Sequence, residues 1–141
     1  MGGTAEIRSA LLARLVAPAP GAALPAASVA WENRAFAPGT ARWYRATFLP
    51  GEPRAAAVGV DAPNRQVGVF QVDVFDPTNK GDAIAAAEAE RIAGSYKRGT
   101  VLSAGGVSVL IRKAYRTRGD NTDPAWYMVS AIIEWQADVE N

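Results

Sequence analysis

The sequence contains neither cysteine nor histidine. Without them the chain cannot form disulfides, thiol nucleophiles, histidine general bases, Ser-His-Asp triads or the usual zinc sites. It also lacks an excess of charge. Fifteen basic side chains stand against fourteen acidic ones, and a net charge of +1 creates no field that would draw the protein onto nucleic acid or anionic lipid. What remains for chemistry is carboxylate catalysis, with or without Mg²⁺, or unusual uses of lysine, tyrosine and serine.

Long apolar runs are missing as well, since none approaches the roughly 20 residues of a membrane span. The first residues imitate a secretory signal, but Glu6 lies early, Arg14 interrupts the apolar stretch and prolines follow it. We therefore expect a folded helix, then a linker, and a cytoplasmic origin. A length of 141 residues, 49% of them hydrophobic, predicts a single domain over residues 1–141.

Helical periodicity predicts two helices. The first is expected to run from an N-cap at Thr4 to about Ala17, where a proline-rich connector over residues 17–27 replaces it. The second is expected to begin at Asp82, to span about sixteen residues and to stop before Gly99. The positions expected to face the core are Ile7, Ala10, Leu11 and Leu15 in the first helix and Ala85, Ala89, Ile92 and Tyr96 in the second.

Alternation of apolar and polar residues predicts the strands. The segments concerned are residues 43–50, 68–76, 100–103, 107–115 and 126–136. The two glycines at Gly105 and Gly106 predict a hairpin turn, residues 118–124 a second turn, and residues 50–66 a long loop with a short strand at residues 57–60. The fold class expected is α+β, with two helices packed on one face of a mostly antiparallel sheet of about four to five strands.

The sheet face predicted to lie away from the helices has the composition of a protein interface. In the segment of residues 68–76, Phe70, Val72 and Val74 share one face and alternate with Val69, Gln71, Asp73 and Phe75. The second set lies with Leu110 and Ile132 and with the charged residues Arg45, Arg112 and Glu134, so this face mixes apolar residues with both signs of charge. The candidates for a subunit interface are Arg45, Val69, Gln71, Asp73, Phe75, Arg112 and Glu134.

Three patterns hint at chemistry without establishing it. Asp73 and Asp76 fall on opposite faces of one strand, so they could share a metal only across a bulge; a Mg²⁺-dependent enzyme using both with Asp61 is a rival interpretation. The basic run RKAYRTR over residues 112–118 resembles a nucleic-acid patch, but Asp120 and Asp123 are expected to neutralise much of it. The glycines of SAGGVS lack the lysine of a phosphate loop. We expect no catalytic residue, cofactor or metal.

Five stretches together resemble a known family. They are WENRAF (31–36), FLP (48–50), GVFQVDVFDPTNKG (68–81), LSAGGVSV (102–109) and WYMVSAIIEWQAD (126–138). In this order they are similar to the tail terminator-like proteins of long-tailed bacteriophages, of the lambda type. The resemblance covers nearly the whole chain, and its motifs are structural rather than chemical.

The resemblance implies a virion protein with no catalytic residues. It implies an α+β fold and a ring, expected to be a hexamer, on the head-proximal end of the tail tube. There the ring would stop tube polymerisation and present a surface to the head-completion protein. The partners implied are further copies of the chain, the tube protein and the head-completion protein, and the protein would be assembled in the bacterial host cytoplasm. A head-to-tail joining (neck) ring is the alternative.

The long loop over residues 50–66 is predicted to be mobile in the free subunit and to become ordered on its partners, because its sequence offers little apolar area for burial. Arg54 and Arg65 are assigned to this loop. If the loop lined the channel of a ring, these two arginines would make at most incidental contact with passing DNA.

Overall fold

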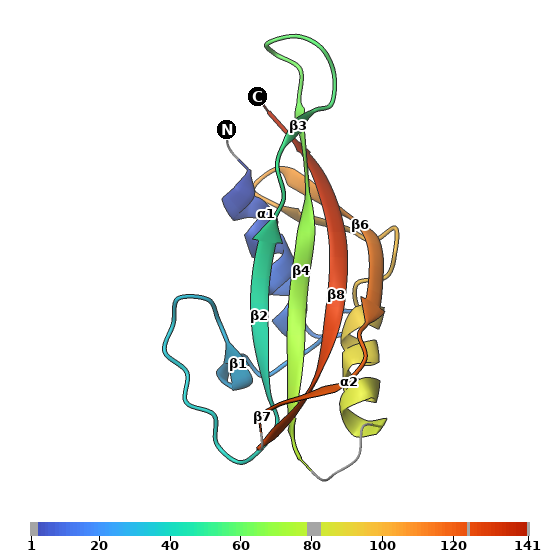
Figure 1. The fold of residues 1–141 in the computed structure, drawn as a ribbon. Helices are drawn as coiled ribbons and strands as arrows, with labels where there is room; N and C mark the ends of the chain where they lie inside the picture. Colours follow the sequence, from blue (N-terminus) through green and yellow to red (C-terminus); the bar gives the residue numbers. More distant parts are fainter. Residues whose placement is uncertain (1–2, 79–82, 124, 141) are drawn as a thin grey trace.

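The computed structural model describes residues 3–78, 83–123 and 125–140 (Figure 1). Within them the chain forms two α-helices, one 3-10 helix and eight strands. In chain order these are α1 (Thr4–Val16), η1 (Ala26–Ser28), β1 (Val29–Ala30), β2 (Trp43–Pro50), β3 (Arg54–Ala55), β4 (Asn64–Pro77), α2 (Ala83–Gly94), β5 (Val101–Ala104), β6 (Val107–Arg116), β7 (Asp120–Asp123) and β8 (Trp126–Val139).

The strands form one sheet in the order β1-β2-β4-β8-β6-β5, with β3 added beside β4 and β7 beside β8. Every pairing is antiparallel except that of β1 with β2. The two central strands, β4 and β8, pair over all fourteen of their residues, from Asn64 opposite Val139 to Pro77 opposite Trp126. The predicted α+β class is therefore confirmed.

The predicted strand number of four to five is wrong, because β1, β3 and β7 are also present. These strands have only two to four residues, which is too short for alternation to be recognised. β3 lies at Arg54–Ala55, and residues 57–60, where a strand was expected, form bends and turns. β7 occupies part of the predicted turn at residues 118–124.

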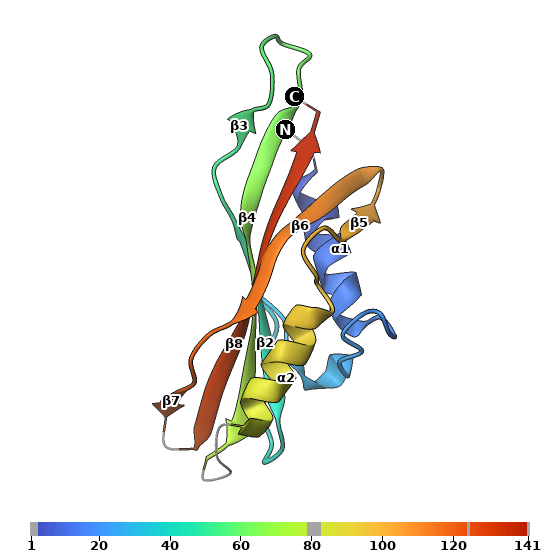
Figure 2. The same cartoon turned by 90° about the vertical axis from the view of Figure 1, so that its right-hand side faces the viewer.

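The helix packing differs in part from the prediction, because the two helices lie on one side of the sheet but pack on different strands. The sheet curves, and both helices lie on its concave side (Figure 2). α2 packs on the central strands β8 and β4 and on β6, whereas α1 packs mainly on β5 and β6, which curl around it. None of the helices in the described ranges is long and apolar enough to cross a membrane.

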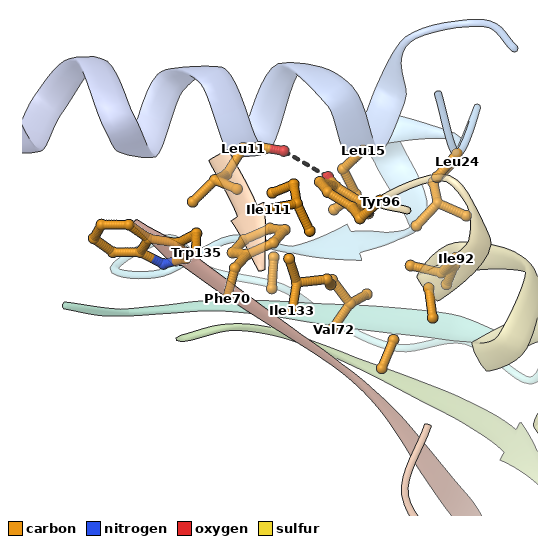
Figure 3. Close-up of a cluster of buried hydrophobic side chains, with 14 of the residues drawn as sticks. Leu11, Leu15, Leu24, Phe70, Val72, Ile92, Tyr96, Ile111, Ile133 and Trp135 are labelled. Atoms are coloured by element: carbon orange, nitrogen blue, oxygen red, sulfur yellow. Dashed lines mark hydrogen bonds between the residues drawn. The ribbon is translucent and has the colours of Figure 1, made fainter. Parts of the chain in front are cut away.

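The core lies between the concave sheet face and the two helices (Figure 3). All eight helix positions predicted to face the core are buried, and so are Phe70, Val72 and Val74 of β4. Tyr96 Oη donates a hydrogen bond of 2.6 Å to the carbonyl oxygen of Leu11, which links the segment after α2 to α1. The proline-rich connector contributes Ala22 and Leu24 to the same core, so it is a packed part of the domain.

The helix ends differ from their predicted positions by a few residues. Gly3, in a left-handed conformation with φ of 100°, is the N-cap of α1, so the prediction of Thr4 as the cap is wrong. Glycine adopts this conformation without the steric cost that a Cβ would bring. The described part of α2 has 12 residues and ends at Gly94, earlier than predicted. The predicted start at Asp82 lies outside the described residues.

Candidate interface on the outer sheet face

The pairing register arranges the candidate interface residues in rows across the convex side of the sheet. Because β4 lies between β2 and β8, each of its outward residues has a neighbour on both sides. The rows are Arg45–Asp73–Ser130, Thr47–Gln71–Ile132 and Leu49–Val69–Glu134. We call these nine residues the outer face. The predicted assignment of Arg45, Val69, Gln71, Asp73 and Glu134 to one side of the sheet is confirmed by this register.

Asp73 occupies the middle of the outer face but is not exposed. Its carboxylate is 1% exposed, Arg45 Nε donates to its Oδ2 at 2.8 Å, and Arg45 Nη2 forms an ion pair with the same oxygen at 2.8 Å. Gln71 Nε2 donates to Oδ1 at 2.8 Å, and Ser130 Oγ donates to the same oxygen. A carboxylate with this many donors is satisfied within its own subunit. The expectation that Asp73 presents its charge to a neighbour is therefore corrected: it holds Arg45, Gln71 and Ser130 in place.

Phe75, expected to supply apolar area to a neighbour, is also buried at 4% exposure. Trp43 stacks on it with ring centroids 4.0 Å apart, and Phe36 stacks on Trp43 in turn, with centroids 5.2 Å apart. The guanidinium of Arg45 lies 5.1 Å from the centroid of the Phe75 ring. Aromatic stacking and a cation over the ring both stabilise such a cluster. Phe75 thus anchors the segment that carries Phe36 and exposes little surface of its own.

Arg112 lies at an irregularity in β6 that changes which side of the sheet each residue faces. Ile111 pairs with Trp135, but the next pair is Lys113 with Glu134, so the register shifts across Arg112. A β-bulge of this kind inserts one residue and reverses the alternation that follows. The residue opposite Glu134 is therefore Lys113, not Arg112. Arg112 is exposed at the bulge.

Sequence reasoning consequently missed Lys113 and Tyr115, which extend the outer face along β6. Tyr115 pairs with Ile132, is 40% exposed, and lies under the Lys113 ammonium at 4.9 Å from its ring centroid. The extension gives the face a cation beside the carboxylate of Glu134. No signal in the sequence marks the bulge, because alternation continues on either side of it.

The two arginines assigned to the loop have different environments. Arg65 belongs to β4, where it pairs with Arg54 of β3, and its Nε donates to Asp138 Oδ1 of β8 at 2.9 Å. The prediction that Arg65 lies on the loop is therefore wrong. The exposed ion pair raises the pKa of Arg65 and lowers that of Asp138. Arg54 is exposed at the base of the hairpin that joins β3 to β4.

Asp76 belongs to a separate network on the helix side of the sheet. It is buried and accepts two hydrogen bonds from Arg42, at 2.6 and 3.2 Å, which raise the pKa of Arg42. Tyr44 Oη donates to Glu88 of α2, and burial together with this bond raises the pKa of Tyr44 to about 12. Burial alone would raise the pKa of Glu88, but hydrogen bonds from Arg91 and Tyr44 lower it overall.

These positions contradict the rival interpretation of a carboxylate metal site. Asp73 and Asp76 are on opposite sides of the sheet and each is bound by an arginine, while Asp61 lies in the exposed hairpin. Among residues 3–78, 83–123 and 125–140, no group of three or more acidic side chains is placed to hold a metal ion. The three aspartates of that hypothesis do not converge.

Residues 113–116 of the basic run line one side of a groove of about 500 Å³ between β6 and the end of α2. Arg116 pairs with Glu90 of α2 at 2.8 Å, and not with the aspartates expected to neutralise the run. Asp120 forms no ion pair with any described residue, and the side chain of Asp123 lies outside what the structure describes. Lys97 and Arg98 also line this groove.

Comparison with known proteins gives a consistent picture. No curated protein matches the chain. One of the solved structures similar to this chain is 26% identical to it, with a TM-score of 0.72, and the match covers 97% of this chain and 96% of the other. The sequence model of a family described as "Phage tail terminator protein" matches residues 6–135, which span every described helix and strand except the first two residues of α1 and the last four of β8. The chain therefore belongs to the phage tail terminator family, which gives it a structural role in a phage tail.

Proposed function

We propose that this protein caps the head-proximal end of a phage tail tube as a ring, stops tube polymerisation and presents the surface for head attachment. The family match over residues 6–135 carries the proposal. The protein would act by contact alone, without catalysis or a cofactor. Its partners would be further copies of itself, the tube protein and the head-completion protein, with at most incidental contact with passing DNA. Assembly would take place in the host cytoplasm and end in the virion.

Termination of a polymer needs a subunit with two unlike surfaces. One must bind the last ring of the tube, and the other must lack the contacts on which the tube grows, so that specificity comes from a missing interaction. Closure into a ring, for which we expect six copies, needs one patch to bind a different patch of the next subunit. The outer face, with its mixed charges, is suited to orient such a contact.

On the outer face and its extension, Lys113 and Glu134 form no ion pair with a described residue, whereas Arg45 and Asp73 pair with each other within the subunit. Val69 and Ile132 add half-buried apolar area between them. We propose that Glu134, at the centre of this group, helps to orient a neighbouring subunit. Arg112 at the bulge remains a candidate at the margin.

The test is the length of tubes grown in the presence of the protein. Tube protein polymerised without heads should stop at shorter lengths when the wild-type chain is added, and Glu134→Lys should weaken this effect. Glu140→Lys is the matched control, since it makes the same charge change at an exposed position near the end of β8. Tubes that elongate equally with and without the wild-type chain would contradict the proposal. A neck ring would also leave tube growth unchanged, so this assay separates the two functions.

A further inference from the structure

The hairpin between β3 and β4 ends in an apolar tip that the subunit does not cover. It projects past the ends of all the other elements (Figures 1 and 2). Val58 at the tip is fully exposed and Val60 is 81% exposed. Asp61 follows directly and forms no ion pair with any described residue. Two large apolar side chains held in water at the tip of a projection are typical of a contact surface.

Backbone hydrogen bonds hold the hairpin in a defined conformation, although its tip is exposed. β3 and β4 pair at its base, Ala56 N donates to Pro63 O at 2.9 Å, and Ala62 N donates to Gly59 O at 3.2 Å. Gly59 has a φ of 124°, a conformation that glycine adopts readily and other residues rarely. These bonds close the hairpin on both sides of its tip, where Val58 and Val60 are exposed.

A groove with apolar walls lies on the exposed side of α1. Its volume is about 390 Å³, and its lining residues are Arg8, Leu12, Ala13 and Val16 of α1 with Trp31 and Arg34 from the segment after β1. The walls are apolar: Leu12 and Trp31 are half-buried, and Val16 is 37% exposed. Neither Arg8 nor Arg34 forms an ion pair with a described residue.

We propose that the hairpin tip of one subunit, with Val58 and Val60, docks in the α1 groove of the next copy of this chain. The volume accommodates two valine side chains. Asp61 would then lie beside Arg8 or Arg34 at the groove mouth, so the charges match as well as the apolar surfaces. The inference rests on the proposed ring and names the contact that closes it. Tip and groove are different patches, and contact between different patches is the kind that generates rings.

The absence of cysteine from the chain makes a direct test possible. Val58→Cys combined with Ala13→Cys places one thiol on the tip and one on an exposed position of the groove. On oxidation of assembled rings, the double variant should give a ladder of covalent oligomers up to the full ring. A mixture of the two single variants should give dimers only. The matched control is Val58→Cys with Ala87→Cys, an exposed alanine of α2 outside the groove, which should remain monomeric in a denaturing gel.

A charge exchange tests the same contact without thiols. Asp61→Arg should weaken subunit association about tenfold, and Arg34→Asp in the same chain should restore much of it. Three results would overturn the inference and leave the proposed function intact. They are rings visible by electron microscopy that give no ladder, a disulfide formed within one subunit, and crosslinking of the Ala87 control equal to that of the groove variant. Failure of the wild-type chain to form rings in the presence of tubes would overturn both.

Discussion

Removal of the Asp73 carboxylate should destabilise the subunit far more than removal of a similar but exposed carboxylate. Asp73→Ala takes away the acceptor for Arg45, Gln71 and Ser130, and it leaves the Ser130 hydroxyl buried without its partner. Hydrogen bonds to charged groups contribute roughly 1.5–3 kcal/mol each, and they are not additive. Breaking a fully buried ion pair costs about 3–5 kcal/mol. The side chain of Arg45 is 49% exposed and can be rehydrated, so we expect a loss of about 2–4 kcal/mol in the free energy of unfolding.

The matched control is Asp138→Ala. Asp138 also pairs with an arginine, Arg65 of β4, but both side chains are nearly half exposed, so water screens the pair and its loss should change stability little. Urea unfolding followed by tryptophan fluorescence measures both losses in the same assay, since the chain has four tryptophans. Equal losses for the two variants would refute the structural role assigned to Asp73.

Three further perturbations test other parts of the structure. Gly68→Ala should lower the free energy of unfolding by about 1–3 kcal/mol in a urea titration, since a Cβ there would lie 2.6 Å from Trp135 Cζ2; no loss would contradict the packing. Glu88→Gln should be less stable than wild type at neutral pH. Hydrogen bonds from Arg91 and Tyr44 lower the pKa of Glu88 despite its burial. The ionised Glu88 therefore stabilises the fold at pH values above the ordinary glutamate pKa, and this stabilisation disappears as the pH falls through the lowered pKa. Stability measured against pH should therefore converge for the two proteins in acid, and a gap that persists there would refute the assignment. Tyr96→Phe should cost about 1 kcal/mol in thermal or urea unfolding by removing a buried hydrogen bond to α1; an unchanged stability would mean that the bond contributes nothing.

The role of Asp73 also changes how the interface should be probed. Reversal of its charge to lysine would place an ammonium group in a buried site against Arg45 and unfold part of the sheet. A loss of ring formation in that variant would then report on folding. Glu134 and Lys113 are better positions, because their side chains reach the surface of the outer face.

Periodicity in the sequence was sufficient to predict the core. Ile7, Leu11 and Leu15 recur every four residues along one side of α1, and Phe70 and Val72 alternate along β4; all five are fully buried. In such segments the apolar periodicity predicts the buried residues correctly, because one side of the helix or strand packs on a single core. The alternation of β4 also placed Asp73 and Asp76 on opposite sides of the sheet, where the structure has them.

Exposure could not be predicted in the same way. Alternation predicts on which side of a strand a residue lies. A long side chain from a neighbouring strand can still cover that residue and bury it. Arg45 covers Asp73, and Trp43 covers Phe75, through pairings between segments far apart in the sequence. The bulge at Arg112 is set by the pairing of β6 with β8 and leaves no local mark.

The hairpin shows a related limit of local patterns. Weak apolar character predicted a loop over residues 50–66, yet the pairing of β3 with β4 gives it a defined base. A two-residue strand becomes visible only when its partner is known. The exposure of Val58, on which the proposed contact between subunits depends, likewise emerged only from the three-dimensional arrangement.

The position of the protein on tails assembled without heads tests the central claim most directly. Electron microscopy of purified tail tubes mixed with the chain reports both stoichiometry and place. The account predicts one closed ring at a single end of each tube, the end to which heads attach. Protein that stays monomeric beside bare tubes, or that binds only once heads are present, would contradict it.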